Sequence, residues 1–431
     1  MLKKLCLSLL FLPLLAWSQQ TISGTFKPAS DFKMAILYKV MPMELVYANH
    51  SNVDSLGRFT IPLKKETEKG LYKIVYASPQ EEYNFDVFYT GQDVELTFSL
   101  DKGTYFIKSE ENKLWQSYNK SMGMITDAIA KFYANPTANK EDFFTLIQLQ
   151  KKSQEQFETA TNAKFINQFI KADRTYYPSV FEDETTYREN IKNNFFDALD
   201  FNNINLLNSD VLVGKALSYV FTYVDFETAN QSYKENIDTL ISIIEDKKVF
   251  KTIILKLLWN EFSRENETVA NYITDTYLLE LAKAENDIKL IEQLILVKNT
   301  SIGAKAPNFE INETSKLYDF NNSSEYLVLF WSSTCGHCLN ELPQLHKAIN
   351  NNIKVIAIGL ENEPEFWTET IKQFPKFIHV YGEGKWDNTI GDSYNVNSTP
   401  SYYLLDKNKL IKAKPYDVEA LKKLLIKTSE N

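Results

Sequence analysis

The stretch LVLFWSSTCGHCLNELPQL, residues 327–345, contains two of the three cysteines in this chain of 431 residues. Its apolar beginning predicts a buried strand, and a helix is expected to start at the C-x-x-C pair. Cys335 would then lie at a helix N-terminus, where unpaired backbone N–H groups and the helix dipole stabilise a thiolate. Cys338 would follow about one turn later, close enough to attack a mixed disulfide on Cys335. The stretch therefore predicts a redox-active dithiol.

Three residues near the pair are candidates for tuning it. Gly336 and His337 separate the cysteines, and a histidine that is cationic near neutral pH would favour the Cys335 thiolate. Glu341 lies one turn after Cys338 on the same helical face and could take the proton of that thiol. The alternatives are a solvated histidine with no role and an ordinary solvated glutamate.

Other uses of a C-x-x-C pair fit this sequence less well. Zinc usually needs four ligands, and the sequence has no second C-x-x-C and no H-x-x-x-H, so we expect no metal and no other cofactor. Haem attachment needs C-x-x-C-H, but position 339 is leucine. Peroxidases that react through a cysteine can carry P-x-x-x-T-x-x-C, and here Val328 and Ser332 occupy the proline and threonine positions. A purely structural disulfide is disfavoured because a secreted protein stabilised by bridges would have several pairs along the chain.

The first eighteen residues have the layout of a secretory signal peptide. Lys3 and Lys4 precede an apolar run that ends in the small-residue pattern at 16–18. We therefore expect export to the periplasm or cell envelope, with an uncleaved N-terminal anchor as the alternative. Cys6 lies at the start of the apolar run and not after a cleavage site, so we do not expect a lipoprotein.

The length, the composition and the changing pattern of apolar residues predict a multidomain globular protein after the signal peptide. Residues 19–105 consist of short alternating segments separated by turns, which predicts an antiparallel β-sandwich. Residues 106–300 have apolar positions at helical spacing, which predicts an α-helical region. In residues 301–431 apolar strands alternate with helices, which predicts an α/β domain with a buried, partly parallel sheet that ends in an antiparallel hairpin. The net charge of −9 argues against nucleic acid or an anionic membrane as partner.

The C-terminal segment resembles the TlpA/ResA-like envelope thiol-disulfide oxidoreductases of the thioredoxin superfamily. The similarity rests on GAKAPNFEI at 303–311, on the strand and turn at 327–338, on the run C-x-x-C-x-x-E-x-P that ends at Pro343, and on NSTPSYYLLDKNKLI at 397–411. Residues 19–105 resemble a small β domain of unknown function that often precedes such modules. The resemblance implies a thioredoxin-like fold for residues 301–431.

The resemblance also implies roles for individual residues. Cys335 would attack a protein disulfide and Cys338 would resolve the mixed disulfide. Thr399 and Pro400 would form a cis-proline turn that faces the cysteines and binds an extended substrate, and Trp331 would contribute to the same surface. Protein thiols and disulfides are the expected partners, and a membrane thiol carrier is the expected electron donor.

Three departures from the family pattern leave the direction of electron flow open. Thr334 replaces the usual tryptophan before the first cysteine, and Leu329 replaces the buried aspartate of thioredoxin itself, which leaves Glu341 as the main proton acceptor. The Gly-His dipeptide is that of protein disulfide isomerase. We expect reduction or isomerisation in preference to oxidation. The rival hypothesis is a partner-binding protein whose thioredoxin-like module is a redox sensor or non-catalytic.

Overall fold

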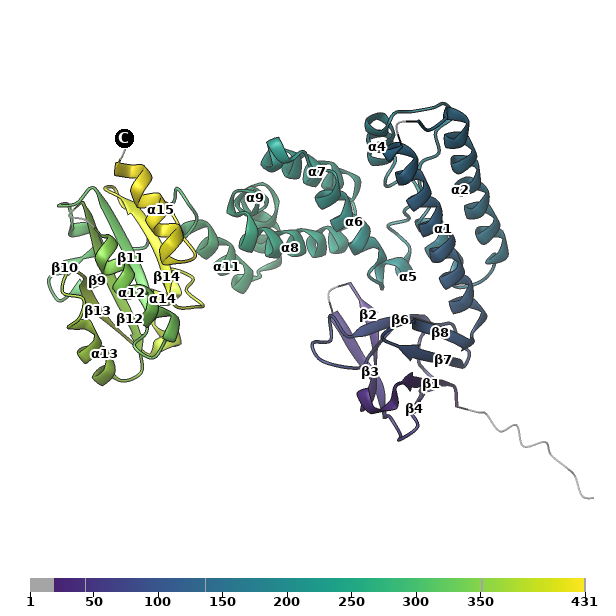
Figure 1. Cartoon of the computed structure of the whole chain (residues 1–431), viewed down its shortest axis with the longest axis horizontal. Coiled ribbons are helices and arrows are strands. Elements are labelled where there is room, and N and C mark those ends of the chain that lie inside the picture. The colour runs from purple at the N-terminus through teal and green to yellow at the C-terminus, as the bar shows by residue number, and fades with distance from the viewer. Residues whose placement is uncertain (1–18, 43, 136, 350–351, 430–431) are drawn as a thin grey trace, which may run out of the picture. The chain divides into compact units, whose positions relative to one another are not determined.

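The computed structural model describes residues 19–42, 44–135, 137–349 and 352–429 (Figure 1). The predicted signal peptide, with Cys6, lies outside the described residues. The chain divides into two compact units, Met1–Ile254 and Leu255–Asn431, each described here by itself. Within the described residues no helix combines the length and the apolar character that crossing a membrane requires.

The first unit begins with two four-stranded sheets, of order β4-β1-β7-β8 and β3-β2-β5-β6. Their strands are β1 (Thr21–Lys27), β2 (Met34–Met41), β3 (Glu44–Asn52), β4 (Arg58–Pro62), β5 (Gly70–Val75), β6 (Asn84–Tyr89), β7 (Val94–Ser99) and β8 (Gly103–Lys108). Buried side chains from both sheets share one core, to which β1 contributes Ile22 and Phe26 and β2 contributes Leu37. The predicted sandwich is confirmed, with the difference that β1 and β7 pair in parallel. These two strands are far apart in the sequence, so no hairpin forces them to run antiparallel.

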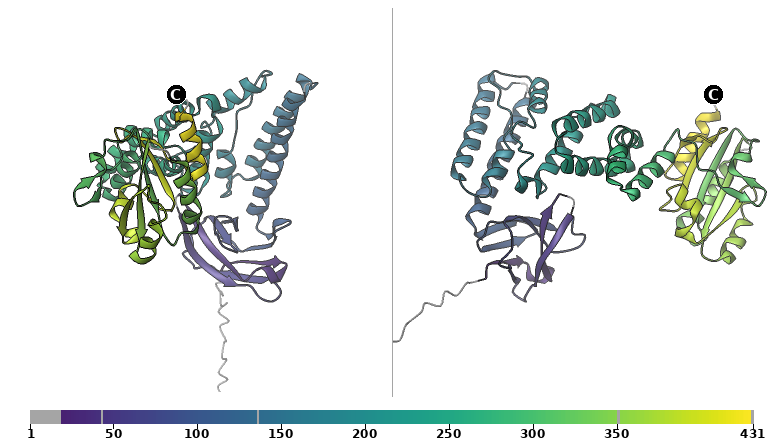
Figure 2. Two further views of the ribbon diagram at one scale, coloured as in Figure 1. Left: turned by 60° about the vertical axis from the view of Figure 1, so that its left-hand side comes forward. Right: turned by 180° about the vertical axis from the view of Figure 1, so that it is seen from behind.

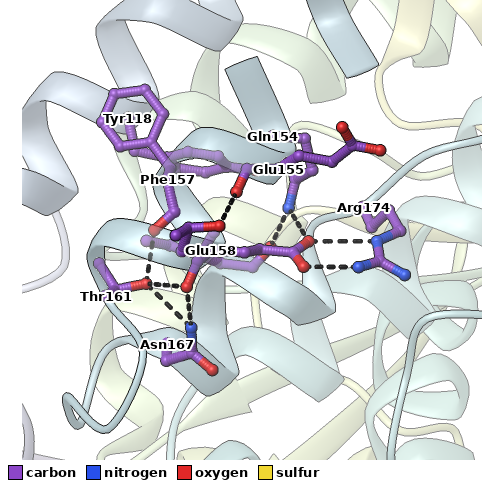
Figure 3. A network of polar contacts seen from close by, with 10 residues as sticks. Tyr118, Gln154, Glu155, Phe157, Glu158, Thr161, Asn167 and Arg174 are labelled. Atoms are coloured by element: carbon purple, nitrogen blue, oxygen red, sulfur yellow. Dashed lines mark hydrogen bonds and ion pairs between the residues drawn. The ribbon is translucent and has the colours of Figure 1, made fainter. Parts of the chain in front are cut away.

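The helices that follow are α1 (Glu110–Ala134), α2 (Lys140–Ala160), α3 (Asn167–Ala172), α4 (Glu184–Asn193), α5 (Ile204–Leu207), α6 (Val211–Thr222), α7 (Ala229–Ile243) and α8 (Lys248–Glu265), which crosses into the second unit. The long helices α1 and α2 run side by side in every view (Figure 2). Figure 3 shows polar contacts where α1 and α2 pack together. Tyr118 of α1 donates a hydrogen bond to Gln154 Oε1 of α2 at 2.9 Å, and Arg174 Nη2 lies 2.5 Å from Glu158 Oε2 of α2. Tyr118 is fully buried, so its contact with Gln154 belongs to the core of the helical region. The predicted α-helical region is confirmed.

The second unit continues with α9 (Glu267–Ile273), α10 (Leu279–Glu285) and α11 (Ile288–Asn299). The α/β part then contains β9 (Glu310–Asn312), β10 (Ser315–Lys316), β11 (Glu325–Trp331), α12 (Gly336–Ala348), β12 (Ile353–Glu361), α13 (Pro364–Ile371), β13 (Ile378–Glu383), α14 (Thr389–Ser393), β14 (Ser401–Asp406), β15 (Ile411–Ala413) and α15 (Val418–Ser429). The five-stranded sheet has the order β13-β12-β11-β14-β15. Strand β13 was not expected, because its sequence IHVYGE lacks a long apolar run.

Strand β11 is the centre of this sheet, and all seven of its residues are buried. It pairs in parallel with β12 and antiparallel with β14, and β14 pairs antiparallel with β15. On one face Leu329 and Trp331 pack against residues of α12 and α15, and on the other face Phe330 packs beside Tyr394 and Tyr403. The partly parallel sheet with a final hairpin is therefore confirmed. A short turn connects the carboxyl end of β11 to the N-terminus of α12.

Candidate functional site

Cys335 is the N-cap residue of α12, as its position before an amphipathic helix predicts. Its sulfur accepts a hydrogen bond from the backbone N–H of Cys338 at 3.2 Å and lies 3.4 Å from the carbonyl oxygen of Thr399. Partial burial opposes ionisation, but hydrogen bonds from Cys338, from the Thr399 side chain and from the His337 backbone outweigh it and lower the pKa of Cys335. The half-buried Cys335 is thus the cysteine of the pair that ionises more readily to a thiolate.

Cys338 has the opposite character. Its side chain is fully buried in the cluster that contains Leu342 and Trp331. Burial raises the pKa of Cys338 to about 12, and the neighbouring Cys335 contributes to the increase. Both cysteines are free thiols in this structure. The pair therefore combines an accessible sulfur that ionises readily with a buried sulfur that keeps its proton.

Glu341 is hydrogen-bonded to residues at the start of β14 and at the start of α15. Its Oε2 accepts hydrogen bonds from the Tyr402 hydroxyl at 2.7 Å and from the Val418 backbone N–H at 3.0 Å. Burial, together with the bond to Glu341, raises the pKa of Tyr402 well above its usual range. Tyr402 packs in the same cluster as Cys338. Glu341 is therefore a fixed, half-buried carboxylate, and its role as proton acceptor stays a prediction.

The structure brings the Thr399–Pro400 turn to the cysteines, although more than sixty residues separate them in the chain. The Thr399–Pro400 peptide is cis, and both residues are partly exposed. Gly336 and His337 are exposed on the same turn as Cys335. These four residues form the accessible surroundings of the Cys335 sulfur.

Trp331 does not belong to this surface. Its side chain is fully buried, and its Nε1 has no hydrogen-bond partner among the described residues. The period-two alternation of β11 turns it into the core together with Leu329, toward α12. The expectation that Trp331 binds substrate is incompatible with this burial and is corrected to a packing role.

The sequence reasoning missed Glu361, the last residue of β12. It is only 3% exposed, its Oε2 accepts a hydrogen bond from the Ser332 hydroxyl at 3.2 Å, and its Oε1 accepts from the Ser333 backbone N–H. The carbonyl oxygen of Ser332 in turn accepts a hydrogen bond from the Cys335 N–H at 3.1 Å. The Ser332 backbone also forms a hydrogen bond with the Cys338 sulfur. Glu361 therefore holds the residue whose backbone contacts both cysteines.

A topological signal could have found Glu361. Parallel strands end at the same edge of a sheet, and in the register of the pair Trp331 lies opposite Gly359. A residue two positions beyond Gly359 must then lie beside the turn that leads to Cys335. Glu361 is the last residue of the strand sequence IKVIAIGLE. Without the register, such a glutamate would be taken for an ordinary solvated residue at the end of a strand.

The arrangement can carry out dithiol chemistry without a bound ion. Among the described residues no group of three or more histidine, cysteine, aspartate or glutamate side chains could hold a metal. The two sulfurs, a fixed carboxylate and an accessible turn are the components that thiol–disulfide exchange uses.

Comparison with known proteins agrees with the fold of this part of the chain. Residues 324–411 match a family model described as thioredoxin-like, so the C-terminal domain belongs to the thioredoxin superfamily. The TlpA/ResA-like grouping is finer than this match and stays a prediction. No curated protein matches the chain.

Several solved structures are similar to the chain. A thioredoxin-like protein from Bacteroides caccae is 20% identical over 58% of this chain and 96% of that chain, with a TM-score of 0.39. The thioredoxin domain of a thiol-disulfide oxidoreductase from Bacteroides vulgatus is 24% identical over 30% of this chain and 97% of its own, with a TM-score of 0.27. A domain of a possible thiol-disulfide isomerase from Cytophaga hutchinsonii is 31% identical over 30% and 94% of the two chains, with a TM-score of 0.26.

Proposed function

Because residues 324–411 form a thioredoxin-like domain, we propose that the chain is an envelope thiol–disulfide oxidoreductase that acts on protein disulfides through Cys335 and Cys338. The observation that carries this proposal is the contrast between the two thiols. Hydrogen bonds lower the pKa of the accessible Cys335, and burial raises that of Cys338. A nucleophile and a resolving thiol need these two properties.

In the proposed reaction the Cys335 thiolate attacks one sulfur of a substrate disulfide. The substrate S–S bond breaks, a Cys335–substrate disulfide forms, and the first substrate sulfur leaves as a thiolate that takes up a proton. Cys338 then loses its proton, for which Glu341 is the proposed acceptor, and attacks the Cys335 sulfur. The products are a Cys335–Cys338 disulfide and two substrate thiols, so two electrons pass from the protein to the substrate.

The partly exposed cis turn at Thr399–Pro400 supports a role in holding an extended substrate beside Cys335. A membrane thiol carrier is the proposed electron donor that returns the Cys335–Cys338 disulfide to the dithiol. Reduction or isomerisation of substrates is the proposed direction. Export through the signal peptide at residues 1–18 would place the protein in the periplasm, and N-terminal sequencing of the periplasmic form should begin near Gln19.

The enzymatic proposal is tested with the pre-reduced protein and a disulfide substrate. The wild-type protein should reduce insulin or cystamine at a measurable second-order rate, and Cys335→Ser should abolish the reaction. Equal rates for the wild type and Cys335→Ser would overturn the proposal and favour a binding protein with a non-catalytic module.

A further inference from the structure

The second unit contains a large polar cleft beside the candidate site. Its volume is about 770 Å³, within the range of known ligand sites of roughly 300–1,000 Å³. Helices α8, α9 and α11 line one wall, and the segment around Asn397 and Ser401 lines the other. All lining residues belong to Leu255–Asn431, the second compact unit.

The cleft adjoins Cys335 through the cis turn. Asn397 and Ser401 line the cleft, and Thr399, which lies between them, has its carbonyl oxygen 3.4 Å from the Cys335 sulfur. Tyr402 points toward α12, where it bonds Glu341, so Ser401 and the next alternate residue of β14 face the opposite side. Segment 397–401 therefore has the reactive sulfur on one side and the cleft on the other.

One side-chain oxygen of the cleft lacks a hydrogen-bond partner in the described part of the chain. Asn271 Oδ1 is buried and has no hydrogen-bond partner among the described residues, although Asn271 lines the cleft. A buried acceptor without a partner is destabilising, and a ligand in the cleft would satisfy this oxygen if the Asn271 side chain turned toward the cleft. Asparagine carries both a donor and an acceptor, which match the C=O and N–H groups of a peptide main chain.

The charges of the cleft also suit a peptide backbone. Glu267 is ion-paired with Lys414, and the other two charged lining residues, Arg264 and Glu265, have opposite signs. A site for a phosphorylated or strongly anionic ligand would carry excess positive charge. A neutral lining rich in amides and hydroxyls favours an uncharged polar ligand.

We propose that this cleft binds the polypeptide segment next to the target cysteine of the substrate protein. This inference rests on the proposed thiol–disulfide exchange at Cys335. A substrate whose sulfur reaches Cys335 and whose chain crosses segment 397–401 would bring its neighbouring residues to the cleft, which Asn397 and Ser401 line. The helices before the thioredoxin-like domain would thus select polypeptide disulfides over small ones.

The test compares a polypeptide disulfide, insulin, with cystamine, a small disulfide that has no peptide group. Asn271→Leu removes the unpartnered amide, and Ser263→Trp fills the cleft from the α8 wall. Losing one or two hydrogen bonds should lower the second-order rate constant for insulin by about 3- to 10-fold, while that for cystamine changes less than about 2-fold. The matched controls Asn299→Leu and Glu261→Trp alter exposed residues outside the cleft and should leave both rates unchanged.

The outcomes separate the cleft from the active site. Unchanged insulin rates in both variants, or equal losses with insulin and cystamine, would overturn the cleft proposal. A wild-type protein that reacts with neither disulfide would instead overturn the proposed function. Circular dichroism of each full-length variant shows whether the fold is retained.

Discussion

Glu361 holds Ser332 through a hydrogen bond of 3.2 Å from the Ser332 hydroxyl to Glu361 Oε2. Ser332 contacts both cysteines through its backbone, so this bond links the end of β12 to the dithiol. In the proposed reaction the carboxylate would act through Ser332 and Ser333, which would make Glu361 a positioning residue.

Glu361→Ala should therefore impair the dithiol more than an ordinary surface change. It leaves the buried Ser333 N–H without an acceptor and the Ser332 hydroxyl with only the Thr334 hydroxyl as a possible acceptor, which should cost about 1–3 kcal/mol in the free energy of unfolding. The attack of Cys338 on a mixed disulfide should slow by roughly 3- to 10-fold, since a loosened Ser332 backbone no longer orients both sulfurs. Chemical denaturation and stopped-flow release of a bound thiol measure the two effects.

Glu361→Gln and Glu383→Ala complete the comparison. Glutamine keeps one acceptor oxygen and should restore much of the loss in stability and in the rate of release. Glu383 pairs with Glu361 in the register of β12 and β13 but is exposed, so Glu383→Ala should behave as wild type. A wild-type release rate in Glu361→Ala would show that Ser332 does not need the carboxylate.

The two thiols should react with alkylating agents over separate pH ranges. Only the thiolate reacts, so the rate rises with pH and levels off once the thiol is ionised. Because the pKa of Cys335 is lowered, its alkylation in Cys338→Ser should reach half of its maximum at a lower pH than that of an ordinary cysteine. The rate for Cys338 in Cys335→Ser should still be rising above pH ~8.5, because burial raises its pKa to about 12. Iodoacetamide labelling followed by mass spectrometry measures both profiles, and a reversed order would contradict the assigned roles.

The reduction potential decides the direction of electron flow. For a reductant or isomerase we expect a value at or below about −180 mV, whereas a strong oxidant would lie near −120 mV. Equilibration with glutathione buffers, read by mass spectrometry after alkylation, gives the potential. His337→Pro is a useful companion variant, because it removes the exposed imidazole beside Cys335. If the imidazole favours the thiolate, this variant should have a lower potential than the wild type.

From the sequence it was possible to predict a β-sandwich, an α-helical region and an α/β domain in this order, and to place Cys335 at the start of a helix. Both predictions rest on local signals, namely the periodicity of apolar residues and the C-x-x-C spacing. The sequence also located the Thr399–Pro400 turn through a family motif. It could not show that Glu361 meets Ser332, since that contact depends on the register of β11 and β12. The burial of Trp331 was missed for a related reason: the face of a fully buried strand to which a side chain points cannot be read from an apolar run.

The most direct test of the central claim is to trap the first step of the reaction. Reduced Cys338→Ser is mixed with insulin, and the adduct is digested and mapped by mass spectrometry, with the double variant Cys335→Ser, Cys338→Ser as control. A stable disulfide between Cys335 and an insulin cysteine is the predicted result, because the thiol that would resolve it is absent. No adduct on Cys335 above the level of the double variant would contradict its role as the nucleophile.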